Sequence, residues 1–135
     1  PDGLEKVLTT IEQFAQGRKI VVFGAGGNRD KEKRPIMGEI VAKHADVCVV
    51  TSDNPRYEEP EKIIEDILEG VRRVKANYVA ITDRKEAIKY AIDIAKPKDT
   101  ILLAGKGHET YIIIKDKVIP FDERQIVMEI LNNTN

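Results

Sequence analysis

The chain has 135 residues, 33% of them charged and 41% hydrophobic, with a formal net charge of -1. These values are typical of one globular domain with its own core. The near-zero net charge gives no bulk attraction for nucleic acid or for an anionic membrane, and one cysteine excludes an intrachain disulfide. No apolar run has transmembrane length and no signal peptide is recognisable, so we expect a cytoplasmic protein without a membrane span.

Hydrophobic periodicity predicts alternating helices and strands in the first half of the chain. The expected elements are a helix at residues 4–15, a strand at residues 19–23, a helix opening at Pro35, a strand at residues 46–51 and a helix opening at Pro60. The expected buried faces are Ile36, Met37, Ile40 and Val41 on the helix after Pro35, and Ile63, Ile64, Ile67, Leu68 and Val71 on the helix after Pro60.

The alternation continues in the second half. A strand at residues 77–81 precedes a helix whose start carries Asp83 and Glu86, a pair that resembles a capping box, and Pro97 marks the end of that helix. A strand at residues 100–104, a hairpin of residues 110–114 and 117–119, and a last helix capped by Asp122 with Gln125 complete the expected elements.

This order predicts an α/β fold: an open, mostly parallel, Rossmann-like sheet with helices on both faces, followed by a C-terminal hairpin and helix. In such sheets ligands bind at the carboxyl ends of the strands. That rule selects three loops, at residues 24–34, 52–59 and 105–109, which also hold the least ordinary residues of the chain.

The first loop is glycine-rich and locally cationic. A dinucleotide-binding fingerprint would need a glycine where Arg29 stands, and the next helix is expected only at Pro35, so a nicotinamide or flavin site is not favoured. Arg29, Lys31, Lys33 and Arg34 outnumber the acidic residues Asp30 and Glu32, which suits a carboxylate or phosphate ligand. A solvated loop with pairs of opposite charge explains the same composition equally well.

The second and third loops carry further candidate binding groups. Asn54 and Arg56 flank a proline that stiffens the backbone, and the pair could hold an amino-acid head group, although an Asn-Pro turn capped by Asp53 is the simpler interpretation of this pair alone. Asp53 also lies where a ribose-binding acid could fall. In the third loop, the glycine spacing around Lys106 excludes a Walker-type phosphate loop, while Glu109 could accept hydrogen bonds from an ammonium group.

Histidine and cysteine give no credible metal site. The chain has two histidines far apart in sequence and one cysteine, and we interpret His108 as a structural hydrogen-bonding residue.

Taken together, the three loops resemble one family. Gly-x-Gly-Gly-x-Arg-Asp occupies residues 24–30, Lys-Arg-Pro-x-Met-Gly residues 33–38, Thr-Ser-Asp-Asn-Pro-Arg residues 51–56 and Ala-Gly-Lys-Gly-His-Glu residues 104–109. This order resembles the C-terminal domain of the Mur ligases that add a diamino acid to a UDP-N-acetylmuramoyl dipeptide, the MurE type. The resemblance covers essentially the whole chain, so residues 1–135 are expected to be a single domain, the last of a three-domain ligase.

The resemblance implies an ATP-dependent amide ligase of peptidoglycan precursor synthesis, with meso-diaminopimelate as the incoming amino acid. ATP, Mg²⁺ and the UDP-N-acetylmuramoyl-L-Ala-D-Glu substrate would bind mainly to the other two domains. The C-terminal domain would close over them and position the amino acid, so no catalytic residue is expected in this chain and the isolated domain should be inactive.

The resemblance also implies residue roles. Arg29 and Arg56 would hold carboxylates of the diamino acid, and Asp53 would brace the second loop. Asn54, the Gly105 carbonyl and Glu109 would hold its far end, and Lys33 would approach the ATP side. Two alternatives remain open: a lysine-adding ligase of the same family, and a stand-alone nucleotide-binding or regulatory module.

Overall fold

The computed structural model describes residues 5–6, 8–9, 12–13, 17–25, 31–52, 58–74, 77–104 and 110–113. Its elements in chain order are β1 (Lys19–Phe23), α2 (Lys33–His44), β2 (Val47–Val50), α3 (Pro60–Arg72), β3 (Tyr78–Ala80), α4 (Arg84–Ile94), β4 (Thr100–Leu103) and β5 (Thr110–Ile113). Residues 5, 6, 8, 9 and 12 are helical and lie within the helix expected at residues 4–15. No helix among these residues is long and apolar enough to cross a membrane.

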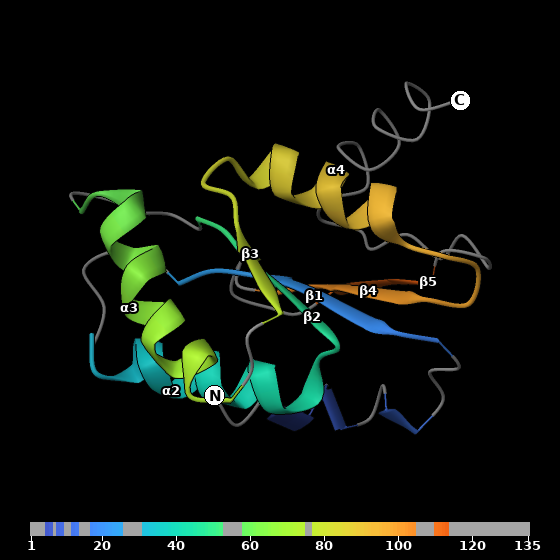
Figure 1. The fold of residues 1–135 in the computed structure, drawn as a ribbon, viewed down its shortest axis with the longest axis horizontal. Coiled ribbons are helices and arrows are strands. Elements are labelled where there is room, and N and C mark those ends of the chain that lie inside the picture. Colours follow the sequence, from blue (N-terminus) through green and yellow to red (C-terminus); the bar gives the residue numbers. More distant parts are fainter. Residues whose placement is uncertain are drawn as a thin grey trace.

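The strands form one five-stranded sheet in the order β3-β2-β1-β4-β5 (Figure 1). The first four strands are parallel and β5 is antiparallel to β4, which confirms the predicted open, mostly parallel sheet. The chain moves outward from β1 to β2 and β3, then crosses back to place β4 on the other side of β1. The strand order therefore reverses between β1 and β4, and sheets of this kind bind ligands at the carboxyl ends of such a pair.

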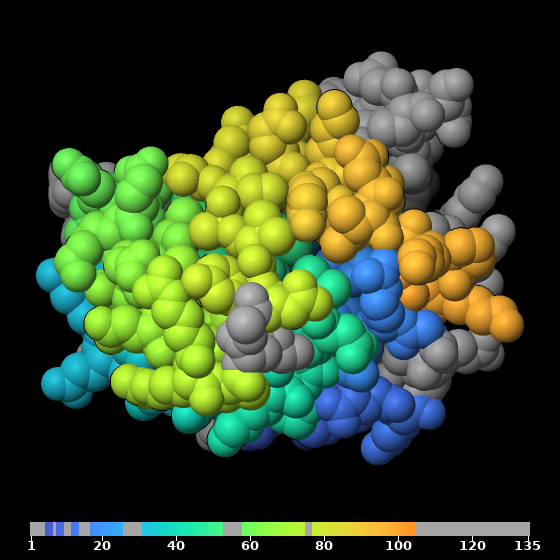
Figure 2. Space-filling model, viewed as in Figure 1, coloured from blue at the N-terminus to red at the C-terminus, as the bar shows by residue number. Residues whose placement is uncertain are grey.

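Helices cover both faces of the sheet, as predicted. Side chains at alternate positions of a strand point to opposite faces, so Val21 and Phe23 pack toward α2 and α3 while Ile20 and Val22 pack toward α4. Figure 1 shows α2 and α3 on one side of the sheet and α4 on the other. In the space-filling view of Figure 2, the side chains of α3 (green) and α4 (gold) flank the edge strand β3.

The start of α2 differs from the prediction. The helix begins at Lys33, so Pro35 is its third residue and the preceding loop is shorter than expected. Val41 is buried as predicted and Met37 and Ile40 are partly buried, but Ile36 is 48% exposed. The expected apolar face is therefore wrong at Ile36. The reason is that α2 contacts α3 through a small residue, Gly38, which hydrophobic periodicity does not weigh.

The α2–α3 contact depends on two glycines. A Cβ atom added at Gly38 would lie 2.2 Å from the Ile67 carbonyl oxygen, and one added at Gly70 would lie 1.7 Å from the Pro35 carbonyl oxygen. Both distances are far shorter than any real carbon–oxygen contact. The two helix backbones are thus closer together than any larger residue would permit, which brings side chains at the start of α2 within reach of α3.

The later elements largely follow the prediction. The five apolar residues predicted to be buried on α3 are all buried. At the start of α4, the Asp83 side chain accepts hydrogen bonds from the Lys85 and Glu86 backbone N–H groups at 2.9 and 3.4 Å, which confirms Asp83 as the cap. The first strand of the predicted hairpin is present as β5, whereas residues 117–119 and the last helix lie outside the described residues.

Candidate functional site

The three candidate loops begin side by side at the carboxyl ends of the central strands. The Thr51 N–H, just after β2, donates to the Phe23 carbonyl at the end of β1 at 2.8 Å. The Ala104 N–H, just after β4, donates to the Val22 carbonyl at 2.9 Å. Backbone hydrogen bonds therefore fix the starting points of all three loops relative to one another. These points lie at the carboxyl ends of the strands, where the strand order reverses.

The predicted substrate-binding residues themselves lie outside the described residues. They are Arg29, Asp53, Asn54, Arg56, Gly105 and Glu109. His108, interpreted as a structural hydrogen-bonding residue, also lies outside the described residues. Lys33 is described: it is exposed and is the first residue of α2, close in sequence to the first loop. Among the described residues, no cluster of three or more His, Cys, Asp or Glu side chains could hold a metal ion.

Two hydroxyl groups anchor the start of the second loop. Thr51 is fully buried, and its hydroxyl donates to the Thr82 carbonyl at 3.1 Å. The Ser52 hydroxyl donates to the same carbonyl at 2.8 Å. These bonds tie the end of β2 to the segment between β3 and α4. From the sequence, Thr51 and Ser52 are recognisable only as part of a family motif, since a hydroxyl pair after a strand does not reveal its distant partner.

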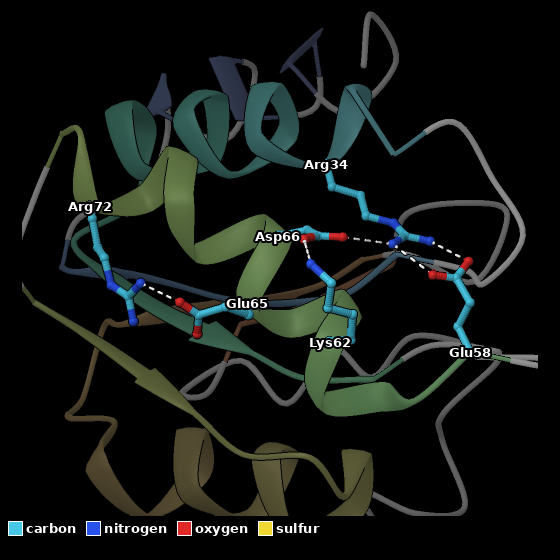
Figure 3. Close-up of polar contacts among 6 residues, drawn as sticks. All are labelled: Arg34, Glu58, Lys62, Glu65, Asp66 and Arg72. Carbon is cyan, nitrogen blue, oxygen red and sulfur yellow. Dashed lines mark hydrogen bonds and ion pairs between the residues drawn. The ribbon is translucent and has the colours of Figure 1, made fainter.

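The end of the second loop is anchored by Arg34, which lies in the first turn of α2. Its side chain is 1% exposed, and it reaches toward both Glu58 and Asp66 (Figure 3). The two Glu58 oxygens accept from Nη1 and Nη2 at 3.0 and 2.8 Å, a two-bond grip, and Asp66 Oδ2 accepts from Nη1 at 2.9 Å. Lys62 adds a second cation, with Nζ 2.8 Å from Asp66 Oδ1.

This arrangement decides between the two interpretations of Arg34 that its sequence context left open. Its guanidinium pairs with carboxylates of the same chain, and it does so as a buried rather than a solvated group. The hydrogen bonds that Arg34 donates to Glu58 raise the pKa of Arg34 above its ordinary value, against an opposing effect of burial and with further support from Asp66. Burial opposes ionisation of Asp66, but hydrogen bonds from Lys62 and Arg34 outweigh it and lower its pKa. Arg34 and Asp66 are therefore ionised at neutral pH.

The start of the third loop has a comparable anchor. Arg84, the first residue of α4, donates from Nη2 to the Ala104 carbonyl at 3.2 Å. Ala104 is buried and directly precedes residues 105–109. Side chains on α2 and α4, on opposite faces of the sheet, thus bind the chain next to two of the three candidate loops.

At the amino ends of the strands, a buried carboxylate binds the backbone. Asp99 is 3% exposed and accepts from the backbone N–H groups of Arg18 and Lys96 at 2.8 and 2.9 Å, and from Arg18 Nε at 3.1 Å. Burial opposes ionisation of Asp99, but these hydrogen bonds outweigh it and lower its pKa. Because this cluster lies at the amino ends of β1 and β4, we assign it to stability.

We expect Asp99→Asn to lower the free energy of unfolding at pH 7 by about 1.5–3 kcal/mol, because an amide nitrogen would replace a charged acceptor facing Arg18. Since the Asp99 pKa is lower in the folded chain, its contribution is present above the ordinary value of about 4 and is lost as pH falls through the folded value. Denaturant titration from pH 7 to pH 2 checks this, with Asp93→Asn on an exposed site of α4 as the control. If Asp99→Asn lowered the free energy of unfolding by the same amount at pH 7 and at pH 2, the prediction would be contradicted.

Comparisons with known proteins agree with this architecture. The family model "Mur ligase, glutamate ligase domain" matches residues 1–107. The chain is 59% identical over 131 residues to the UDP-N-acetylmuramoyl-L-alanyl-D-glutamate--2,6-diaminopimelate ligase of Caldanaerobacter subterraneus subsp. tengcongensis, a match covering 97% of this chain and 27% of that protein. It is 54% identical over 132 residues to the ligase of the same name from Clostridioides difficile, covering 98% of this chain and 27% of that protein.

A solved structure of a UDP-N-acetylmuramoyl-L-alanyl-D-glutamate--2,6-diaminopimelate ligase superposes with a TM-score of 0.82 at 37% identity. That match covers 99% of this chain and 28% of the other, so the chain spans little more than a quarter of the relatives it matches. Family model, sequence identity and three-dimensional similarity all give the same assignment: the chain belongs to the Mur ligase family and corresponds to its glutamate ligase domain.

Proposed function

We propose that this chain is the amino-acid-selecting domain of an ATP-dependent amide ligase, which adds meso-diaminopimelate to UDP-N-acetylmuramoyl-L-Ala-D-Glu in the cytoplasm during peptidoglycan precursor synthesis. The observation that carries the proposal is that the three motif-bearing loops start next to one another, at the carboxyl ends of the strands where the strand order reverses. The relatives named above are diaminopimelate ligases, which supports the choice of amino acid.

In this proposal the loops form a pocket for a doubly zwitterionic amino acid. Arg29 and Arg56 bind carboxylates, because a guanidinium can donate two parallel hydrogen bonds to one carboxylate. Asn54, the Gly105 carbonyl and Glu109 bind the far ammonium and carboxylate, and Asp53 braces the second loop. Lys33 is exposed at the start of α2, which suits a contact with the ATP side of the closed enzyme.

The proposed reaction forms one amide bond. The γ-phosphate of ATP is transferred to a carboxyl of the glutamate in the nucleotide-linked dipeptide, which gives an acyl phosphate and ADP. The diaminopimelate amine attacks the acyl carbon, loses a proton and displaces inorganic phosphate. Bound Mg²⁺ would neutralise phosphate charge in the parts of the ligase outside this chain. The residues of this chain hold the amine in line with the acyl carbon, which is a contribution of position and orientation.

The full-length protein tests this proposal. With ATP, Mg²⁺, the UDP-N-acetylmuramoyl dipeptide and meso-diaminopimelate, it should release phosphate and yield the tripeptide product by mass spectrometry. The chain of residues 1–135 alone should give neither. No tripeptide from the full-length protein, or phosphate release well above background by residues 1–135, would contradict the proposal.

A further inference from the structure

We propose that Arg34 and Glu58 are a positioning pair that fixes the end of the second loop relative to α2, the helix that follows the first loop. The inference rests on the proposed function, because it treats these loops as the amino-acid site. Neither residue would touch the substrate. Their ion pair would instead determine where the loop residues can place their side chains.

The position of the pair in the chain supports this role. Arg34 lies on α2 just after the first loop, and Glu58 directly follows residues 53–57. Arg56 is two residues from Glu58, so their Cα atoms are at most about 7 Å apart. Fixing Glu58 against α2 therefore limits how far the Arg56 Cα can move away from Glu58.

The geometry of the pair fixes direction as well as distance. Glu58 uses both carboxylate oxygens on the two terminal nitrogens of Arg34, and its side chain is 16% exposed. A two-bond contact between planar groups resists rotation, which a single bond would allow. Burial shields it from solvent screening. The end of the second loop is thus held in one orientation relative to α2.

Asp66 offers a matched comparison on the same guanidinium. Its side chain is 13% exposed, and it accepts from Arg34 Nη1 at 2.9 Å (Figure 3). However, it lies inside α3, which is already fixed by buried Ile63 and Ile67 and by the close approach at Gly70. Loss of the Asp66 contact should therefore reduce stability without moving the loop.

The experiment compares Glu58→Gln with Asp66→Asn in the full-length ligase. Both changes remove one charge from the same cluster and keep side-chain size. We expect Glu58→Gln to raise KM for meso-diaminopimelate about tenfold, since misplaced binding groups commonly cost one to two orders of magnitude, with KM for ATP and for the nucleotide dipeptide unchanged. Asp66→Asn should leave all three KM values within about twofold, although thermal denaturation should show a similar loss of stability in both variants.

Two further measurements keep the result decisive. If Glu58→Gln does not fold, Glu58→Asp, which keeps the charge but shortens its reach, should raise the same KM about threefold or more. Amide hydrogen exchange of residues 53–57 in the full-length protein should be faster in the Glu58 variants than in Asp66→Asn. Because exchange needs no substrate, it tests the pair even if the wild-type enzyme were to reject meso-diaminopimelate and so refute the proposed function. An unchanged KM and unchanged exchange in the Glu58 variants, or equal effects from Asp66→Asn, would overturn the inference.

Discussion

Replacing Arg56 with lysine in the full-length ligase is expected to raise KM for meso-diaminopimelate about ten- to a hundredfold. Lysine keeps the positive charge, but its ammonium cannot donate the two parallel hydrogen bonds that a guanidinium gives to a carboxylate. Losing a charge-assisted hydrogen bond at a desolvated site costs about 1.5–3 kcal/mol, which converts to that range of affinity. Steady-state kinetics with meso-diaminopimelate as the varied substrate measure the effect.

The matched control is Arg73→Lys. Arg73 is exposed beyond the end of α3 and is not among the residues proposed to bind the amino acid, so the same chemical change should leave KM unaltered. A wild-type KM in Arg56→Lys would show that Arg56 does not bind a substrate carboxylate, and Arg29 would then be the first candidate for that contact.

Gly70→Ala should destabilise the fold by about 3 kcal/mol or more. Alanine is the better helix former, by about 1 kcal/mol, so propensity alone predicts a gain in stability. However, its Cβ would lie 1.7 Å from the Pro35 carbonyl oxygen, a backbone atom that cannot move without shifting α2. Overpacking of this kind costs about 1–3 kcal/mol and sometimes more, so the steric penalty outweighs the propensity. Moving α2 would also lengthen the Arg34–Asp66 contact.

Denaturant unfolding checks this prediction, with Glu69→Ala as the control. Glu69 is the neighbouring residue on α3 and is exposed, so its truncation should change the free energy of unfolding by no more than about 0.5 kcal/mol. A Gly70→Ala variant as stable as the wild type would mean that α2 and α3 can separate at no cost, contrary to the packing described here.

The sequence predicts the layers of this fold better than the contacts between its helices. β1, β2 and β4 are short apolar runs buried on both faces, and α3 carries one continuous apolar face, so periodicity identifies them. The α2 helix is different because Gly38 packs directly against the backbone of α3. A glycine adds nothing to a hydrophobic pattern, and the prediction consequently placed exposed Ile36 in the core.

In the candidate site, too, the sequence predicts the location of the loops better than the contacts between distant residues. The rule that ligands bind at strand carboxyl ends selects three loops, and the structure places their starting points side by side. The partners of Arg34 could not be predicted, because Glu58 and Asp66 are 24 and 32 residues away and only the packing of α3 on α2 brings them together. The local charge pattern left a ligand or charge pairing equally open for Arg34, and the structure shows pairing with distant carboxylates of the same chain.

The most direct test of the proposed role is a competition assay in which the full-length ligase chooses among meso-diaminopimelate, its LL isomer and L-lysine. Lysine lacks the far carboxylate, so binding it would leave an arginine of the proposed pocket without a partner, a penalty that can exceed what a missing methylene gives. The LL isomer would direct its far carboxylate and ammonium to the wrong groups. We predict that kcat/KM for meso-diaminopimelate exceeds both others by at least about a hundredfold. Comparable turnover of lysine and meso-diaminopimelate would contradict the assignment of this domain as a diaminopimelate selector.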